Sequence, residues 1–292
     1  MISDHPTSRY FDSQRLRLHC ADWGNPTAPP LLLIHGGLDH CRSWDWVAGR
    51  LRSRWHVIAP DLRGHGDSAW SGDGNYSMLA FVTDLVQLMP LLDGAPVTII
   101  AHSLGGNIAL RYAGLYPAQV RQVVAIEGLG PSPKLLAERE QKSMPQRLPE
   151  WIDARSLASR RQPRRYASFA EAVARMQARN PQLAAGQINH LAQHAAKQND
   201  DGSWSWKFDH LVRGLTPVDV NPAVLHELWA AIHCPTLLCH GAKSWASDPG
   251  QDGRIRHFSH ARVATFADAG HWVHHDQLER FLRVLAEFLQ RP

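Results

Sequence analysis

Short apolar runs alternate with amphipathic helical patterns along most of this chain, and that alternation constrains the fold more than any other feature. An apolar run of four to eight residues is typical of a strand buried on both faces of a sheet, and a helix between two such runs makes the strands parallel. The predicted strands lie within 16–24, 30–37, 55–68, 96–103, 120–133, 234–241 and 261–272. The predicted helices are 43–53, 78–92, 104–117 and 276–290. The sequence therefore predicts an α/β fold with a mainly parallel sheet.

The alternation breaks between about 131 and 230, where the chain is polar, arginine-rich and mostly helical. This segment carries no clear buried strand and one aromatic patch, GSWSWKFDH at 202–210. A chain of 292 residues accommodates a core of about 200 residues with an insertion of about 100. We predict a core made of 1–130 and 231–292, and a helical lid of 131–230 over one end of the sheet.

Composition excludes several classes of protein. Hydrophobic residues make up 44% and charged residues 20%, which supplies a core and argues against disorder. The net charge of +4 is mild and no run of five Lys or Arg occurs, so we expect no nucleic-acid partner. No apolar stretch approaches the ~18 residues of a membrane span, and the polar start MISDHPTSRYFDSQ lacks a signal-peptide core. The four cysteines follow no disulfide or metal spacing, so we expect a cytoplasmic protein.

One serine lies where a predicted strand meets a predicted helix, in IIAHSLGGNIALRYAG at 99–114. A strand, a tight turn carrying serine and a helix form the nucleophile elbow, whose pattern G-x-S-x-G stands here as Ala101 to Gly105 around Ser103. Small residues are needed because the nucleophile lies in strained backbone and its neighbours nearly touch across the turn. The alternative is that Ser103 only caps a helix.

The chain resembles the α/β-hydrolase family over nearly its full length. The matching motifs are HGG at 35–37, DLRGHGDS at 61–68, AHSLGG at 101–106 and AGHW at 269–272, in the family's order. The resemblance implies a mostly parallel eight-stranded sheet with helices on both faces and an inserted helical lid. It also implies a serine hydrolase that cleaves an ester-like bond through an acyl-enzyme.

The same resemblance assigns roles to residues. Ser103 is the expected nucleophile, His271 the base that takes and returns its proton, and the backbone amides of Gly37 and Leu104 the expected oxyanion hole. No cofactor and no metal are implied, and the expected partner is a small-molecule substrate, neutral or weakly acidic. The sequence predicts no oligomeric state.

The carboxylate that should orient His271 is not in the family's usual place. Most members carry an Asp three residues after the glycine of an HG pair, but here His240-Gly241 is followed by Ser244. Glu127, at the end of the strand in 120–133, is one candidate, because some lid-bearing members carry their acid there. Asp248, on the loop after Ser244, is the other. We favour Glu127, with its pairing to a lid arginine as the alternative.

Other polar residues receive structural interpretations. His35 and His102 are expected to support loops, and Asp61 is expected to hold the glycine-rich loop together with Asp67 and Ser68. HWVHH at 271–275 has no accompanying carboxylate cluster, so we expect no metal site there. Three other functions stay open: a carbon–carbon bond hydrolase, a cofactor-free oxygenase or perhydrolase, and a non-catalytic ligand-binding protein.

Overall fold

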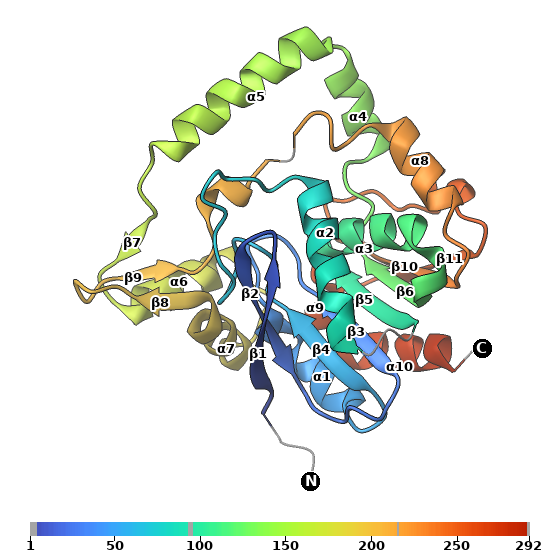
Figure 1. Cartoon of the computed structure of the whole chain (residues 1–292), viewed down its shortest axis with the longest axis horizontal. Helices are drawn as coiled ribbons and strands as arrows, with labels where there is room; N and C mark the ends of the chain where they lie inside the picture. The colour runs from blue at the N-terminus through green and yellow to red at the C-terminus, as the bar shows by residue number, and fades with distance from the viewer. Residues whose placement is uncertain (1–4, 93–95, 215, 291–292) are drawn as a thin grey trace.

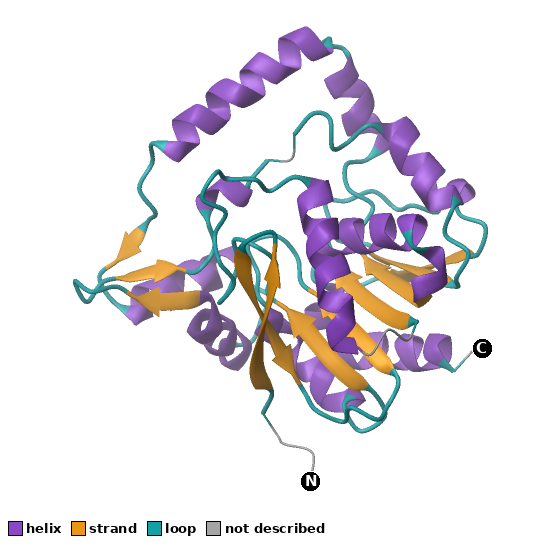
Figure 2. Ribbon diagram, in the orientation of Figure 1, coloured by secondary structure: helices purple, strands orange, loops and turns teal. Residues whose placement is uncertain are grey.

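One central sheet organises the molecule (Figures 1 and 2). The structure, a computed structural model, describes residues 5–92, 96–214 and 216–290. Residues 1–4 of the polar start, in which we predict no signal-peptide core, lie outside the described residues. Within the described chain the sheet has eight strands in the order β1-β2-β4-β3-β5-β6-β10-β11. The strands are β1 (Thr7–Ser13), β2 (Leu16–Asp22), β3 (Pro30–Ile34), β4 (His56–Pro60), β5 (Val97–His102), β6 (Val120–Ile126), β10 (Thr236–Gly241) and β11 (Ala261–Phe266).

The sheet is mostly parallel, as the sequence predicts. β3 pairs in parallel with β4 and β5, β6 with β5 and β10, and β10 with β11, whereas β2 runs antiparallel to both β1 and β4. The sequence analysis missed β1. This edge strand is largely exposed and has no apolar run, so the side-chain pattern does not indicate a strand. Its position in the sheet is defined by its backbone pairing with β2.

Both faces of the sheet are buried because its central strands carry runs of consecutive apolar residues. Along β3, Leu32 and Ile34 belong to one core cluster, and Leu31 and Leu33 to the other. The first cluster is covered by α2 (Met78–Leu88), α3 (Leu104–Leu115) and α8 (Pro222–Ala230), the second by α1 (Asp45–Leu51) and α10 (Leu278–Leu289). Each fully buried leucine or isoleucine contributes roughly 1.5–3 kcal/mol to this packing. The predicted helices on both faces are confirmed.

Short helices complete the core. They are η1 (Cys41–Trp44), η2 (Met89–Leu92), η3 (Pro117–Gln119), η5 (Arg254–His257) and α9 (Val273–Asp276). α3 ends at Leu115, two residues before Pro117, since proline has no amide hydrogen with which to continue a helix. None of the described helices is long and apolar enough to cross a membrane.

The inserted segment (131–230) is mostly helical but also contains strands. Its helices before α8 are α4 (Pro133–Glu140), α5 (Met144–Ser159), α6 (Phe169–Arg179), α7 (Ala185–Ala195) and η4 (His210–Val212). A small antiparallel sheet joins β7 (Arg165–Tyr166), β9 (Trp204–Trp206) and β8 (Ala196–Gln198). The sequence analysis expected no clear buried strand here, and these three strands are only partly buried. It did not anticipate them, because two or three residues are too few for alternation to show.

The parts of the inserted segment differ in how they meet the core. α5 has no buried residue, and Figure 1 shows α4 and α5 at the top of the view, away from the sheet. α7 packs close to the core, where Ile188 and Leu191 form a cluster with Trp46 and Trp272. α8 lies so close to α3 that a β-carbon on Gly114 would stand 2.3 Å from the carbonyl oxygen of Leu228.

Candidate active site

Ser103 occupies a strained turn between β5 and α3. Its φ of 50° and ψ of −113° are outside the ordinary regions for a side chain that carries a β-carbon. The turn fits because its neighbours are small. A β-carbon on Gly105 would lie 2.5 Å from the carbonyl oxygen of His35, and one on Gly106 would lie 2.7 Å from the Cα of Gly128. The predicted elbow is therefore present, and its glycines are required by contacts with two other loops.

His271 meets this serine from the loop between β11 and α9. Its Nε2 lies 2.9 Å from Ser103 Oγ, which is hydrogen-bonding distance. His102 holds the backbone of His271, because its Nε2 donates to the His271 carbonyl oxygen at 2.9 Å. Burial lowers the pKa of His102 well below its usual value, so this ring is neutral. His102 thus supports the His271 loop.

Glu127 lies on the other side of His271, directly after β6. One of its carboxylate oxygens, Oε2, is 3.6 Å from His271 Nδ1. Oε1 accepts hydrogen bonds from the Gly241 amide at 2.7 Å and His240 Nδ1 at 3.0 Å, and Oε2 accepts one from Ser244 Oγ at 3.0 Å. The side chain is 1% exposed. Ser244 occupies the position at which most family members carry the acid. Here its hydroxyl instead donates a hydrogen bond to Glu127, which follows the neighbouring strand β6.

Glu127 is ionised despite its burial. Burial by itself would raise its pKa, but His271, the Gly241 amide and the Ser244 hydroxyl stabilise the charged form and hold the pKa below its usual value. The described partners of this carboxylate come from the core, and none is an arginine of the inserted segment.

Asp248 is used differently. Its Oδ1 accepts the Gly250 amide at 2.8 Å, and its carbonyl oxygen accepts the amides of Gln251 and Asp252, so the residue turns its own loop. Within the described residues no ion pair of 4 Å or less joins Asp248 to His271. Of the two candidate acids, the fold brings Glu127 to the histidine.

Gly37 and Leu104, whose backbone amides are predicted to form the oxyanion hole, lie near each other in the structure. Leu104 is the first residue of α3, so its amide has no acceptor within the helix. Gly37 lies close to Leu104, because a β-carbon built on Gly37 would stand 3.8 Å from Leu104 Cδ2. His35 fixes this turn: its Nδ1 donates to the Gly36 carbonyl at 2.7 Å and its Nε2 accepts the Leu62 amide at 3.0 Å. Burial lowers the pKa of His35 to about 4, which keeps the ring neutral for these two roles.

A cavity of about 630 Å³ opens beside these groups. The core contributes Gly37 and His271 to its wall, and the inserted segment contributes aromatic and basic side chains. Trp245 also lines it: its ring stacks on His271 with centroids 4.8 Å apart, yet 77% of the residue is exposed. The sequence analysis singled out neither Trp245 nor the cavity's basic residues, because residues scattered over 160–245 form no motif.

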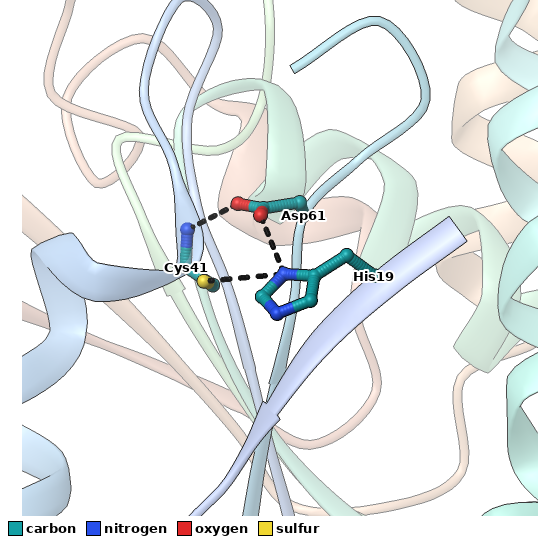
Figure 3. Close-up of side chains that lie close together, drawn as sticks. All are labelled: His19, Cys41 and Asp61. Atoms are coloured by element: carbon teal, nitrogen blue, oxygen red, sulfur yellow. Dashed lines mark hydrogen bonds and ion pairs between the residues drawn. The ribbon is translucent and has the colours of Figure 1, made fainter. Parts of the chain in front are cut away.

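Among the described residues, two clusters contain residue types that can bind metal ions. In the first, His19 of β2, Cys41 of η1 and Asp61 directly after β4 lie close together (Figure 3). Asp61 Oδ2 accepts His19 Nδ1 at 2.8 Å and Oδ1 accepts the Cys41 amide at 2.7 Å. Burial raises the pKa of the Cys41 thiol well above its usual value, so the thiol is neutral. These bonds, with that from the Asp67 amide to Asp61 at 2.9 Å, hold the glycine-rich loop as predicted for Asp61.

The second cluster joins α1 to α7. Asp45 accepts hydrogen bonds from Arg42, the shortest at 2.6 Å, and His190 Nε2 lies 3.1 Å from the same carboxylate, with His194 close by. The Arg42 guanidinium already neutralises Asp45, which suits a contact between helices. In HWVHH, His274 stacks on Trp44 and His275 meets Trp46 edge to face, so the two rings pack in the core.

Comparisons with known proteins agree with the alpha/beta hydrolase fold. A family model for the alpha/beta hydrolase fold matches residues 29–278, a range that contains Ser103, Glu127 and His271. The chain is 26% identical to a serine hydrolase-like protein of Danio rerio, over 92% of this chain and 83% of that protein. It is 27% identical to an esterase of Mycobacterium tuberculosis, over 90% of this chain and 83% of that one. The thioesterase domain from the curacin biosynthetic pathway superposes with a TM-score of 0.83 at 23% identity, covering 97% of this chain and 99% of that domain.

Proposed function

The chain belongs to the alpha/beta hydrolase family, and we propose that it is a serine hydrolase that cleaves a carboxylic ester through an acyl-enzyme. The observation that carries the proposal is the 2.9 Å contact between His271 Nε2 and the hydroxyl of a serine held in a strained elbow. Relatives described as an esterase and as an sn-1-specific diacylglycerol lipase support the class of bond.

In the proposed mechanism Ser103 Oγ attacks the ester carbonyl while His271 Nε2 takes the hydroxyl proton. Glu127 fixes the Nδ1–H tautomer of His271 and stabilises the imidazolium that forms. The oxyanion is bound by the amides of Gly37 and Leu104. His271 then gives its proton to the leaving alcohol, and in the second half-reaction it activates a water molecule that releases the acid and regenerates Ser103.

The other functions are weaker candidates. A ligand-binding protein gains nothing from a serine in a strained conformation, which costs about 1–3 kcal/mol and persists where function uses it. A carbon–carbon bond hydrolase and a cofactor-free oxygenase would use the same groups, and no feature of the site favours them over ester hydrolysis. The inserted segment is the proposed lid that selects the substrate, because α/β folds bind ligands at the carboxyl ends of their strands.

The test is the variant Ser103→Ala with p-nitrophenyl acetate as substrate. We expect kcat to fall by about 10³-fold or more, as for other triad nucleophiles. A fluorophosphonate should label the wild type and leave Ser103→Ala unlabelled. Ser156, one of the two exposed serines of α5, serves as control, and Ser156→Ala should retain wild-type activity and labelling. If Ser103→Ala kept more than about a tenth of wild-type activity, the assignment of the nucleophile would be wrong.

A further inference from the structure

The cavity beside His271 is lined by four arginines. They are Arg164 in the loop between α5 and β7, Arg175 and Arg179 on α6, and Arg213 after η4. The described residues that line the cavity include no aspartate and no glutamate. A concave site with one sign of charge concentrates ligands of the opposite charge.

These arginines lack the partners that arginines elsewhere in the chain have. Arg42 and Arg165, for example, pair with carboxylates at 2.6 Å. Across the described chain, none of the four cavity arginines forms an ion pair of 4 Å or less with a carboxylate. Arg164 lies over the ring of Tyr166 at 5.3 Å and Arg213 over that of Phe208 at 5.7 Å, which leaves their N–H groups available.

Their arrangement brings like charges together. Arg175 and Arg179 are four residues apart, so they project from one face of α6. Arg213 belongs to another part of the inserted segment, and its pKa is lowered first by burial and then by the positive charge of Arg179. Arginines that repel one another and have no counterion are stabilised when an anion binds between them, so this arrangement is typical of an anion-binding site.

We propose that the substrate of this hydrolase carries an anionic group, a carboxylate or a phosphate, which Arg175, Arg179 and Arg213 bind while the ester carbonyl lies at Ser103. The inference rests on the proposed function and narrows the substrate class from neutral or weakly acidic to anionic. The aromatic lining, which includes Trp206 and Trp272, would contact the part of the substrate between the two ends.

The test compares matched esters that differ in charge. On the acyl side the pair is p-nitrophenyl butyrate and mono-p-nitrophenyl glutarate. On the alcohol side methyl 4-acetoxybenzoate is compared with 4-acetoxybenzoate and with 4-acetoxyphenyl phosphate, which separates a carboxylate from a phosphate. We expect kcat/KM for at least one anionic ester to exceed that of its neutral partner about tenfold at low salt, and the ratio to fall as NaCl screens the charges.

The double variant Arg175→Gln/Arg179→Gln links the preference to these residues. We expect it to lower the anionic-to-neutral ratio of kcat/KM about tenfold or more. Arg283→Gln is the matched control: it removes one charge from the exposed side of α10, and the ratio should stay as in the wild type.

The possible outcomes separate the two proposals. Hydrolysis of the neutral esters with no preference for an anionic one would overturn this inference and leave the proposed function standing. A preference that the double variant leaves intact would also overturn it. Failure to cleave any ester, with no fluorophosphonate labelling, would overturn the proposed function and the inference with it.

Discussion

Ser103 and Glu127 share an unusual backbone conformation. Both carry side chains at positive φ, 50° and 53°, and they follow β5 and β6, where His102 and Ile126 are register partners. Two strained residues therefore stand side by side at the carboxyl ends of neighbouring parallel strands, the edge at which α/β sheets bind ligands. The Ser103 amide donates a hydrogen bond to the Ile126 carbonyl oxygen at 2.8 Å, and this bond links the turn after β5 to the turn after β6.

At this scale the acid can be tested with a pair of amide variants. Glu127→Gln removes the charge that would stabilise the His271 imidazolium, and we expect kcat for p-nitrophenyl acetate to fall about 10²- to 10⁴-fold. Asp248→Asn changes a residue that turns its own loop, so kcat should stay within about tenfold of the wild type. The measurement is steady-state hydrolysis, with circular dichroism to check folding. A reversed order of the two effects would assign the acid to Asp248.

At the scale of elements, the site depends on how closely the loop after β3 approaches the elbow between β5 and α3. A β-carbon on Gly36 would stand 2.7 Å from His102 Nδ1 and 3.3 Å from Ser103 Cβ. Both neighbours are fixed, His102 by its bond to the His271 carbonyl and Ser103 by the turn. The proposed oxyanion amide of Gly37 is the next residue, so any shift of this loop moves it.

Gly36→Ala should therefore impair both activity and stability. We expect kcat for p-nitrophenyl acetate to fall about tenfold or more, and the free energy of unfolding to fall by about 1–3 kcal/mol, the usual cost of overpacking. The matched control is Gly49→Ala within α1, where a β-carbon would meet nothing within 4 Å. That change should raise the free energy of unfolding by about 0.4–1 kcal/mol and leave kcat unaltered. Urea titration measures the free energy of unfolding of both variants, and steady-state hydrolysis measures kcat. A Gly36→Ala variant with unchanged stability and kcat would contradict the close approach of the two loops.

At the scale of the whole molecule, buried neutral histidines link stability to pH. Burial lowers the pKa of His35 to about 4 and those of His40, His65 and His275 to about 3. His102 and His274 are shifted in the same direction. As the pH falls below 6.5 the unfolded chain binds protons that the folded protein does not, so stability falls with pH. Asp39 opposes this, because burial raises its pKa to about 7, but one carboxyl is outweighed by several histidines.

We therefore expect the free energy of unfolding to fall steeply from pH 6.5 towards pH 4.5. His274→Phe should reduce that slope by about 1 kcal/mol per pH unit, since one buried histidine contributes up to about 1.4. The phenyl ring keeps the stacking on Trp44, and neither nitrogen of His274 forms a hydrogen bond with any described residue. The exposed His260 provides the control, His260→Gln. Urea titrations between pH 4.5 and 7.5 measure the slopes, and equal slopes in wild type and His274→Phe would contradict the expectation.

The sequence by itself determined seven of the eight strands of the sheet and the elbow, because these features rest mainly on local patterns. The partnership of Ser103 with His271, which lie 168 residues apart, was expected only from the resemblance to the α/β-hydrolase family. Apolar runs must be buried on both faces, and a tight turn between a strand and a helix favours small residues around the serine. Tertiary structure decided the rest. It brought Glu127, and not Asp248, within 3.6 Å of His271, and it gathered arginines from α6 and the chain after η4 around one cavity. Such contacts depend on the paths of loops and on residues far apart in the sequence. The periodicity of apolar residues along the chain predicts neither of these.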